Sequence, residues 1–238
     1  MGQPSAKIAY GKNLIAPETA WAGPKTVANG SQHLRGGAEK PTWRTMFNDT
    51  SSLLAHLSTR RSGKARDMVA PGPDAATLHD IIALALRTPD HGKLAPWRIV
   101  TIADDQRDAF AALLKTAWVA ENPGAAGMDL SALDQFAHQA PTLLVLLSTP
   151  VPGAKIPLWE QQMSAGAVGM NLLHAAHAHG FVGSWLTGWA AYSAEVAAAF
   201  GAGEDDKIVG YFFIGTASRD LDERPRPEYD DVGRAWEI

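Results

Sequence analysis

Two arginine-containing segments hold the residues of this chain that could do chemistry. The first is Arg60-Arg61-Ser62, which places two guanidinium groups and a hydroxyl next to one another. Guanidinium groups bind phosphate through planar, paired hydrogen bonds, so this triplet could form an anion-binding site. The simpler alternative is a solvated helix end, and the triplet alone does not decide between the two.

The second segment runs from Arg87 to Trp97 and contains Thr88-Pro89-Asp90-His91. Pro89 should end the preceding helix, because proline donates no backbone hydrogen bond and restricts the residue before it. Asp90 and His91 would then project from a constrained turn, which is a common place for ligand-binding side chains. The alternative is a proline-rich connector with a capping histidine.

The elements that must position these segments alternate between helical and extended patterns. Apolar residues at helical spacing mark the expected helices, and runs of branched apolar residues mark the expected strands. Helices are expected over 53–59, 74–86, 109–118, 157–180 and 195–200, and buried strands over 97–102, 142–148 and 207–216. The mixed order of short strands and helices predicts the α+β class with a three-layer arrangement.

The composition of the 238 residues, 46% of them hydrophobic, allows one sizeable core. The absence of cysteine excludes disulfides, thiol nucleophiles and iron–sulfur clusters. A net charge of −4 gives no indication of a nucleic-acid partner. No apolar run reaches the roughly 20 residues of a membrane span, and no signal peptide is recognisable, so a cytoplasmic protein without a membrane partner is expected.

Residues 1–45 differ in pattern from the remainder. They carry six basic and two acidic residues, with scattered glycine and proline and no helical or strand period. We expect this segment to be a disordered or loosely attached extension. Residues 46–238 would then form the folded domain.

Six segments in order make the chain resemble the FMN-dependent nitroreductases, specifically their compact YdjA-like branch. They are Arg60-Arg61-Ser62, Arg87 to His91, Pro96-Trp97, Trp159-Glu160-Gln161 with Ser164 to Gly166, Gly180-Phe181 with Trp185 and Gly188, and Lys207 to Gly210 with Gly215-Thr216. The resemblance covers the chain from about residue 50 to 216. It implies the nitroreductase fold, a three-layer α/β/α sandwich with a mixed, mainly antiparallel central sheet.

The resemblance also implies the cofactor contacts. Contacts to FMN are implied for Arg60, Arg61, Ser62, Arg87, His91, Trp185, Leu186 and Thr187. Two positions depart from the family pattern, since relatives have a polar residue or Arg in place of Leu186 and often Gln in place of Ala95. Leu186 could offer FMN only backbone groups and apolar contact. Arg224 or Arg226 could add a phosphate contact.

A contact to the nicotinamide dinucleotide is implied for one further segment, which consists of Ala175, Ala176, His177, Ala178, His179 and Gly180. His174 and His177 are also spaced i, i+3 on one helix, which leaves a metal-binding alternative open. A third interpretation, polar residues at the exposed end of a helix, is favoured over the metal. No metal site is expected.

No residue stands out as a nucleophile or general base, so no catalytic residue is assigned. This fits a flavin mechanism, because the cofactor carries out the hydride chemistry itself. The resemblance implies a homodimer with FMN near its interface, the C-terminal tail crossing to the partner, and a ping-pong cycle. NADH or NADPH would reduce the flavin, and a nitroaromatic, quinone or similar electron-poor acceptor would reoxidise it. Four tryptophans could wall the flat site, namely Trp97, Trp159, Trp185 and Trp189.

Two other functions stay open. One is a non-catalytic flavin carrier or redox sensor, which the departures at Ala95 and Leu186 favour. The other is a different flavin reaction on the same scaffold, such as dehalogenation or ene reduction.

Overall fold

A computed structural model of the chain describes residues 47–124 and 127–237. The extension expected over residues 1–45 lies outside the described residues. The longest described helix has 21 residues. No helix in these two ranges combines the length and the apolar character needed to cross a membrane.

Five strands form the central sheet, and every pairing between them is antiparallel. They are β1 (Met68–Val69), β2 (Trp97–Ile102), β3 (Thr142–Ser148), β4 (Val182–Leu186) and β5 (Lys207–Ala217). The central strands β3 and β5 pair with each other; β2 adds to β3, while β4 and β1 pair with successive stretches of β5.

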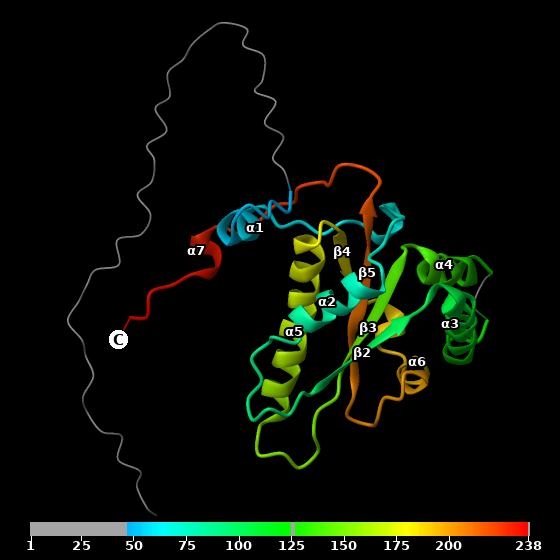
Figure 1. The fold of residues 1–238 in the computed structure, drawn as a ribbon. Helices are drawn as coiled ribbons and strands as arrows, with labels where there is room; N and C mark the ends of the chain where they lie inside the picture. The colour runs from blue at the N-terminus through cyan, green and yellow to red at the C-terminus, as the bar shows by residue number, and fades with distance from the viewer. Residues whose placement is uncertain (1–46, 125–126, 238) are drawn as a thin grey trace, which may run out of the picture. The chain divides into compact units, whose positions relative to one another are not determined.

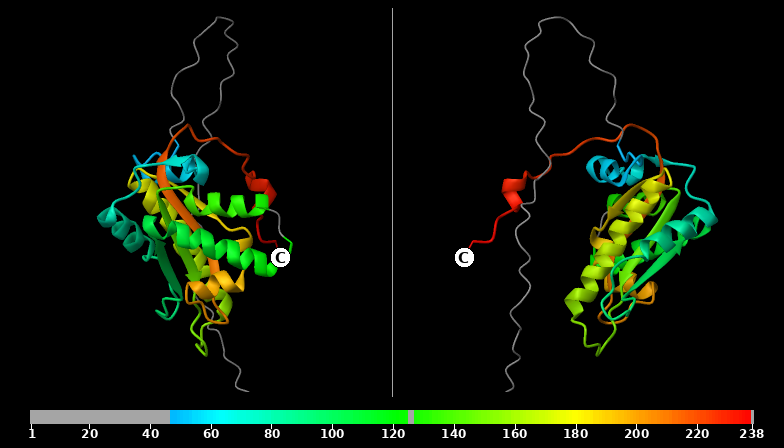
Figure 2. Two further views of the ribbon diagram at one scale, coloured as in Figure 1. Left: turned by 90° about the vertical axis from the view of Figure 1, so that its right-hand side faces the viewer. Right: turned by 60° about the vertical axis from the view of Figure 1, so that its left-hand side comes forward.

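Helices cover both faces of the sheet (Figure 1). The α-helices are α1 (Leu53–Thr59), α2 (Ala75–Ala85), α3 (Arg107–Glu121), α4 (Gly127–His138), α5 (Leu158–Ala178), α6 (Ala194–Ala199) and α7 (Tyr229–Val232). Short 3-10 turns are η1 (Ala65–Asp67), η2 (Asp104–Gln106) and η3 (Trp189–Ala191). Figure 2 shows α3 and α4 in front of the sheet in one view and α5 in front of it in the other.

The core divides into two clusters because neighbouring residues of a strand point to opposite faces. Leu144 and Leu146 of β3 pack with Val168 of α5 in one cluster. Leu143 and Leu147 pack with α3 in the other. The predicted α+β class and three-layer arrangement are therefore confirmed.

Two expectations about burial need correction. The strand over 97–102 forms as predicted, but only Ile102 of it is buried, because β2 is an edge strand with a partner on one side. The apolar residues of α1 are exposed, and the residue that the helix buries is His56. Helix α4 was not predicted from the sequence.

Candidate functional site

Helix α1 delivers the Arg60-Arg61-Ser62 triplet at its C-terminal end. Ser52 caps the start of the helix, and the chain turns to an extended conformation at Arg60. The Asn48 side chain then holds the Arg61 backbone from both sides: Nδ2 donates to the carbonyl at 3.0 Å, and Oδ1 accepts from the amide at 2.7 Å. Gly63 N donates to Gly183 O at 3.1 Å, which ties the triplet to β4.

A groove of about 410 Å³ opens beside the triplet, and we call it the arginine groove. Its lining consists of Arg60, Arg61, Ser62, Met170, Leu173, Trp185, Thr187 and Arg224. Five of the eight residues expected to contact FMN are thus brought together. Met170 and Leu173 were not among the expected residues, although their i, i+3 spacing on the long helix places them on the same side.

Positive charge accumulates in this groove. Burial lowers the pKa of Arg60, and so do the nearby charges of Arg226, Arg61 and Arg224. Glu223 is the one carboxylate that acts on Arg60 in the opposite sense among the described residues. Arg60 Nη1 donates to Ser62 Oγ at 3.3 Å. A multiply charged anion would relieve the mutual repulsion of these guanidinium groups, so the groove has the electrostatics of a phosphate site.

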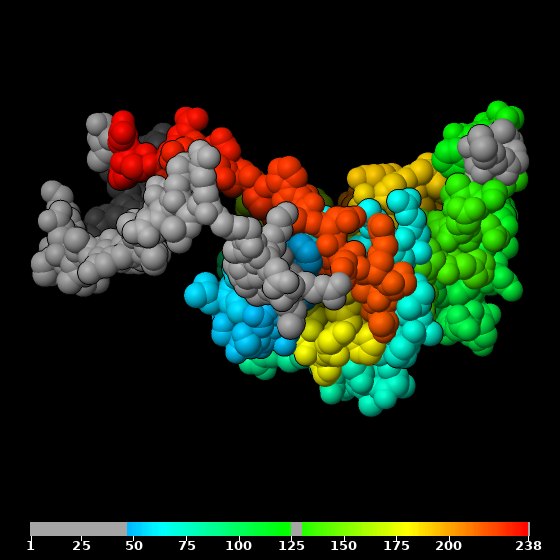
Figure 3. Space-filling model, turned by 90° about the horizontal axis from the view of Figure 1, so that it is seen from above, coloured from blue at the N-terminus to red at the C-terminus, as the bar shows by residue number. Residues whose placement is uncertain are grey.

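The segment after β5 brings Arg224 and Arg226 to the groove. Ion pairs join Arg219 Nε to Asp67 at 2.6 Å and Lys64 Nζ to Asp222 at 2.8 Å. Arg226 Nη2 reaches the Arg60 carbonyl at 3.3 Å. Figure 3 shows this segment, in orange, lying against the segment that follows α1, in cyan. The arginine groove is therefore assembled from both ends of the described chain.

Trp185 forms the inner wall of the groove. Its Nε1 donates to Val209 O at 3.0 Å, and its ring lies 5.1 Å from that of Phe212. Glycines make room for it, since a Cβ at Gly210 would collide with the indole and one at Gly169 would lie 3.1 Å from it. The next residue along β4 points to the opposite face, so the Leu186 side chain packs against the other core cluster.

The turn from Arg87 to His91 runs along α5 toward the start of the helix. Its Thr88 accepts a hydrogen bond from Asn171 Nδ2 at 2.8 Å, in the second half of α5. His91 Nδ1 is 2.7 Å from Glu160 Oε2 in the first turn of the helix. Ser164 Oγ donates to Pro89 O at 2.7 Å. Glu160 and Leu173 are separated by roughly 20 Å along the helix axis. His91 therefore lies far along α5 from the arginine groove of its own chain, and neither Arg87 nor His91 lines that groove.

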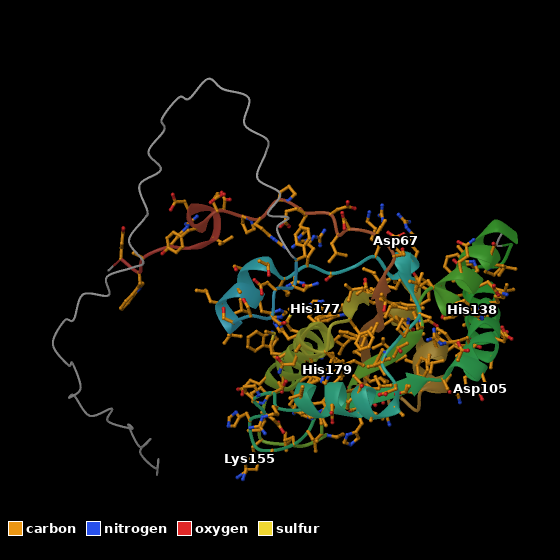
Figure 4. All side chains as sticks on the ribbon, turned by 45° about the horizontal axis from the view of Figure 1, so that its top comes forward. Asp67, Asp105, His138, Lys155, His177 and His179 are labelled. Carbon is orange, nitrogen blue, oxygen red and sulfur yellow. The ribbon has the colours of Figure 1, made fainter. Side chains whose placement is uncertain are left out.

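The segment expected to contact the nicotinamide dinucleotide is only partly accessible to a ligand. Ala175, Ala176 and His177 are buried, whereas the three residues that follow are exposed. Figure 4 labels His177 and His179 at this end of α5. A contact through this segment stays a prediction, and it would be made by Ala178, His179 and Gly180.

The histidines of this region join α1 to α5. His56 Nε2 lies 2.7 Å from His174 Nδ1, and the His56 and His177 rings are 5.6 Å apart. Neither ring nitrogen of His177 has a hydrogen-bond partner within residues 47–124 and 127–237. Burial, reinforced by the charges of His56 and Arg60, lowers the pKa of His177 to about 3. Among the described residues, no three side chains of His, Cys, Asp or Glu are placed so that they could hold a metal ion together.

The four tryptophans expected to wall one flat site lie apart. Trp185 lines the groove, whereas Trp189 Nε1 donates to Glu121 at the end of α3. Trp159 is 68% exposed on the first turn of α5. Trp97 begins the edge strand β2.

Known proteins resemble this chain in both sequence and fold. The profile described as Nitroreductase family matches residues 57–216. YdjA of Escherichia coli (strain K12), whose NAD(P)H nitroreductase activity is a prediction, is 36% identical over 166 residues, which cover 68% of this chain and 87% of YdjA.

Two solved structures share the fold. A nitroreductase-like family protein from Bacillus cereus matches with a TM-score of 0.67 at 19% identity, covering 79% of this chain and 97% of that one. The NADPH:FMN oxidoreductase from Vibrio harveyi, complexed with NAD+, matches with a TM-score of 0.57 at 19% identity, covering 75% and 76%.

The buried histidine predicts an acid-sensitive stability. The pKa of His177 is lower in the folded chain than in the unfolded chain, so the unfolded state binds more protons below pH 6.5. The free energy of unfolding should fall with decreasing pH by about 1.4 kcal/mol per pH unit from this residue alone. Urea unfolding of wild type and His177→Met between pH 7 and pH 4.5 would measure it. The variant should show a shallower slope, and the exposed control His179→Met should match wild type; equal slopes for all three would contradict the assignment.

Proposed function

The chain belongs to the nitroreductase family, and from that premise we propose that it passes electrons from NADH or NADPH to nitroaromatics, quinones or similar electron-poor acceptors. It is an NAD(P)H-dependent flavin oxidoreductase with FMN as its cofactor. The acceptor class and the ping-pong order, in which both substrates use the same place over the flavin in turn, are the proposal. The observation that carries it is the arginine groove.

The residues of the groove fit FMN. A phosphate dianion matches the excess positive charge of the four arginines around it, and Ser62 adds a hydroxyl donor. Met170, Leu173 and the Trp185 edge offer apolar surface for a flat ring system. Leu186 would contribute backbone groups alone, because its side chain packs in the core. When bound, FMN supplies the hydride chemistry, and the chain holds and orients it.

We propose that a second copy of the chain completes the site with its own Arg87 and His91. In a two-fold dimer whose α5 helices pack antiparallel, the first half of one helix lies beside the second half of the other. That arrangement would bring the turn of one copy to the arginine groove of its partner. It would also explain why His91 lies far along α5 from the groove of its own chain and why Arg87 does not line that groove.

Exposed apolar side chains support this dimer. Trp159 and Met163 form an apolar strip on the first half of α5, at 68% and 55% exposure. A stable interface would remove such a strip from water. Exposed apolar residues also lie on α1 and on the C-terminal tail, namely Leu53, Leu54, Leu57, Tyr229, Val232 and Trp236. We propose that the tail contacts the partner copy.

An anaerobic absorbance titration tests the function. The full chain loaded with FMN should lose its oxidised flavin absorbance on addition of NADPH or NADH, because the nicotinamide transfers hydride to the flavin. The absorbance should return on addition of a quinone or nitroaromatic. Bound FMN that neither nicotinamide reduces would instead support the carrier or sensor alternative.

Removal of a groove arginine should weaken FMN binding through the phosphate. We expect Arg60→Ala or Arg224→Ala to raise the Kd of FMN by about 10- to 100-fold, the worth of a charge-assisted hydrogen bond. The Kd of riboflavin, which lacks the phosphate, should stay within about two-fold of wild type. Arg66→Ala removes an exposed arginine outside the groove and serves as the matched control. An equal loss of both ligands would contradict a phosphate role.

Mixed dimers test the shared site. One chain carries Arg60→Ala with Arg224→Ala, and the other carries Arg87→Ala with His91→Ala. If each site takes its groove from one copy and its turn from the other, a heterodimer purified through two different tags has one intact site. It should bind about half the wild-type FMN content, while both parent homodimers bind little. A site built within one chain would leave the heterodimer as deficient as its parents.

A further inference from the structure

His91 of the turn and Glu160 of α5 form a carboxylate–imidazole pair, to which binding of FMN assigns no role. Glu160 Oε2 lies 2.7 Å from His91 Nδ1. The side chain of His91 is 66% exposed, and that of Glu160 is 41% exposed. An imidazole that donates through Nδ1 to a carboxylate keeps a proton on that atom and leaves Nε2 free to exchange protons with a ligand or water.

The backbone that carries His91 is held firmly on α5. Thr88 Oγ1 donates to Ala85 O at 2.9 Å and accepts from Asn171 Nδ2 at 2.8 Å. The Asp90 carboxylate accepts from Ala95 N at 2.7 Å. Glu160 is the carboxylate that contacts His91 among the described residues.

The proposed reaction requires a proton in addition to the hydride. Reduction of a quinone to a hydroquinone consumes two electrons and two protons. Transfer of a hydride to the quinone would account for both electrons and one of the two protons. The second proton must come from water or from the protein, and a positioned general acid accelerates such a transfer by about 10²- to 10⁴-fold.

We propose that His91 is the proton donor to the acceptor and that Glu160 is its positioning residue. The proposal rests on the proposed function, in which the turn of one copy lies at the groove of the other. The Nε2–H bond of the imidazolium breaks as an O–H bond forms on the acceptor. His91 is left neutral with its remaining proton on Nδ1, and water returns a proton to Nε2.

The first test needs neither flavin nor turnover. Nitrogen-15 NMR of the full chain without added cofactor distinguishes the two neutral tautomers of His91, with His91→Gln used to assign the signals. Wild type should show the proton on Nδ1. Glu160→Ala should shift the population toward the Nε2–H form, whereas Glu160→Gln, whose amide oxygen accepts the same hydrogen bond, should keep the wild-type tautomer. An unchanged tautomer in Glu160→Ala would overturn the positioning role.

The second test compares two acceptors on the FMN-loaded protein. Benzoquinone needs a proton for its reduction, whereas ferricyanide takes electrons alone. Glu160→Ala should slow turnover with benzoquinone by about 10-fold or more and leave turnover with ferricyanide within about two-fold of wild type. Glu204→Ala, which removes an exposed carboxylate in the turn before β5, should change neither rate.

The outcomes separate the two proposals. Equal rates of wild type and Glu160→Ala with both acceptors, or an equal loss with both, would overturn the proton-donor role alone. A wild-type protein that reduces neither acceptor would overturn the proposed function as well.

Discussion

The repulsion among closely placed guanidinium groups is the constraint on which the candidate site depends. Arg60 is partly buried beside Arg61, Arg224 and Arg226, with Glu223 in opposition. Such a cluster survives only because the backbone around it is held in place: Asn48 clamps Arg61, Gly63 bonds to Gly183, and ion pairs fix the segment after β5. The repulsion among these charges destabilises the folded state, and binding of an anionic ligand would stabilise it.

Helix α5 connects this charge to the rest of the chemistry. Its buried side packs on the sheet through Val168 and Leu172, and the groove takes Met170 and Leu173 from its second half. Its first turn carries Glu160 and hence orients His91. A helix is rigid over this length, so its rise per residue fixes the distance between Glu160 and the groove residue Leu173. Two antiparallel copies would turn this fixed separation into two complete sites.

The sequence predicted the regular elements well and the surfaces less well. Strand β3 and helix α5 carry strong apolar patterns, and both formed where expected. The edge position of β2 and the exposure of the α1 leucines depend on which neighbour is present, which a local pattern does not contain. Five of the expected FMN residues meet in one groove because a backbone hydrogen bond from Gly63 to Gly183 joins the segment after α1 to β4, which carries Trp185 and leads to Thr187. Arg87 and His91 do not line this groove, which depends on tertiary distances that the periodicity of the sequence does not reveal. The buried His56 was missed, because a lone histidine among leucines gives no signal of burial.

The orientation of Leu186 bears on how such sites change over evolutionary time. The alternation of β4 sends the Leu186 side chain against the core, while Trp185 and Thr187 on either side of it line the groove. A cofactor contact at this position would be made by the main chain, and selection on it would leave the side chain to follow the changing volume of the core. Leucine here and a polar residue in a relative would then make the same main-chain contact. Divergence at such a position overstates functional distance, and a comparison based on residue identity would misjudge it.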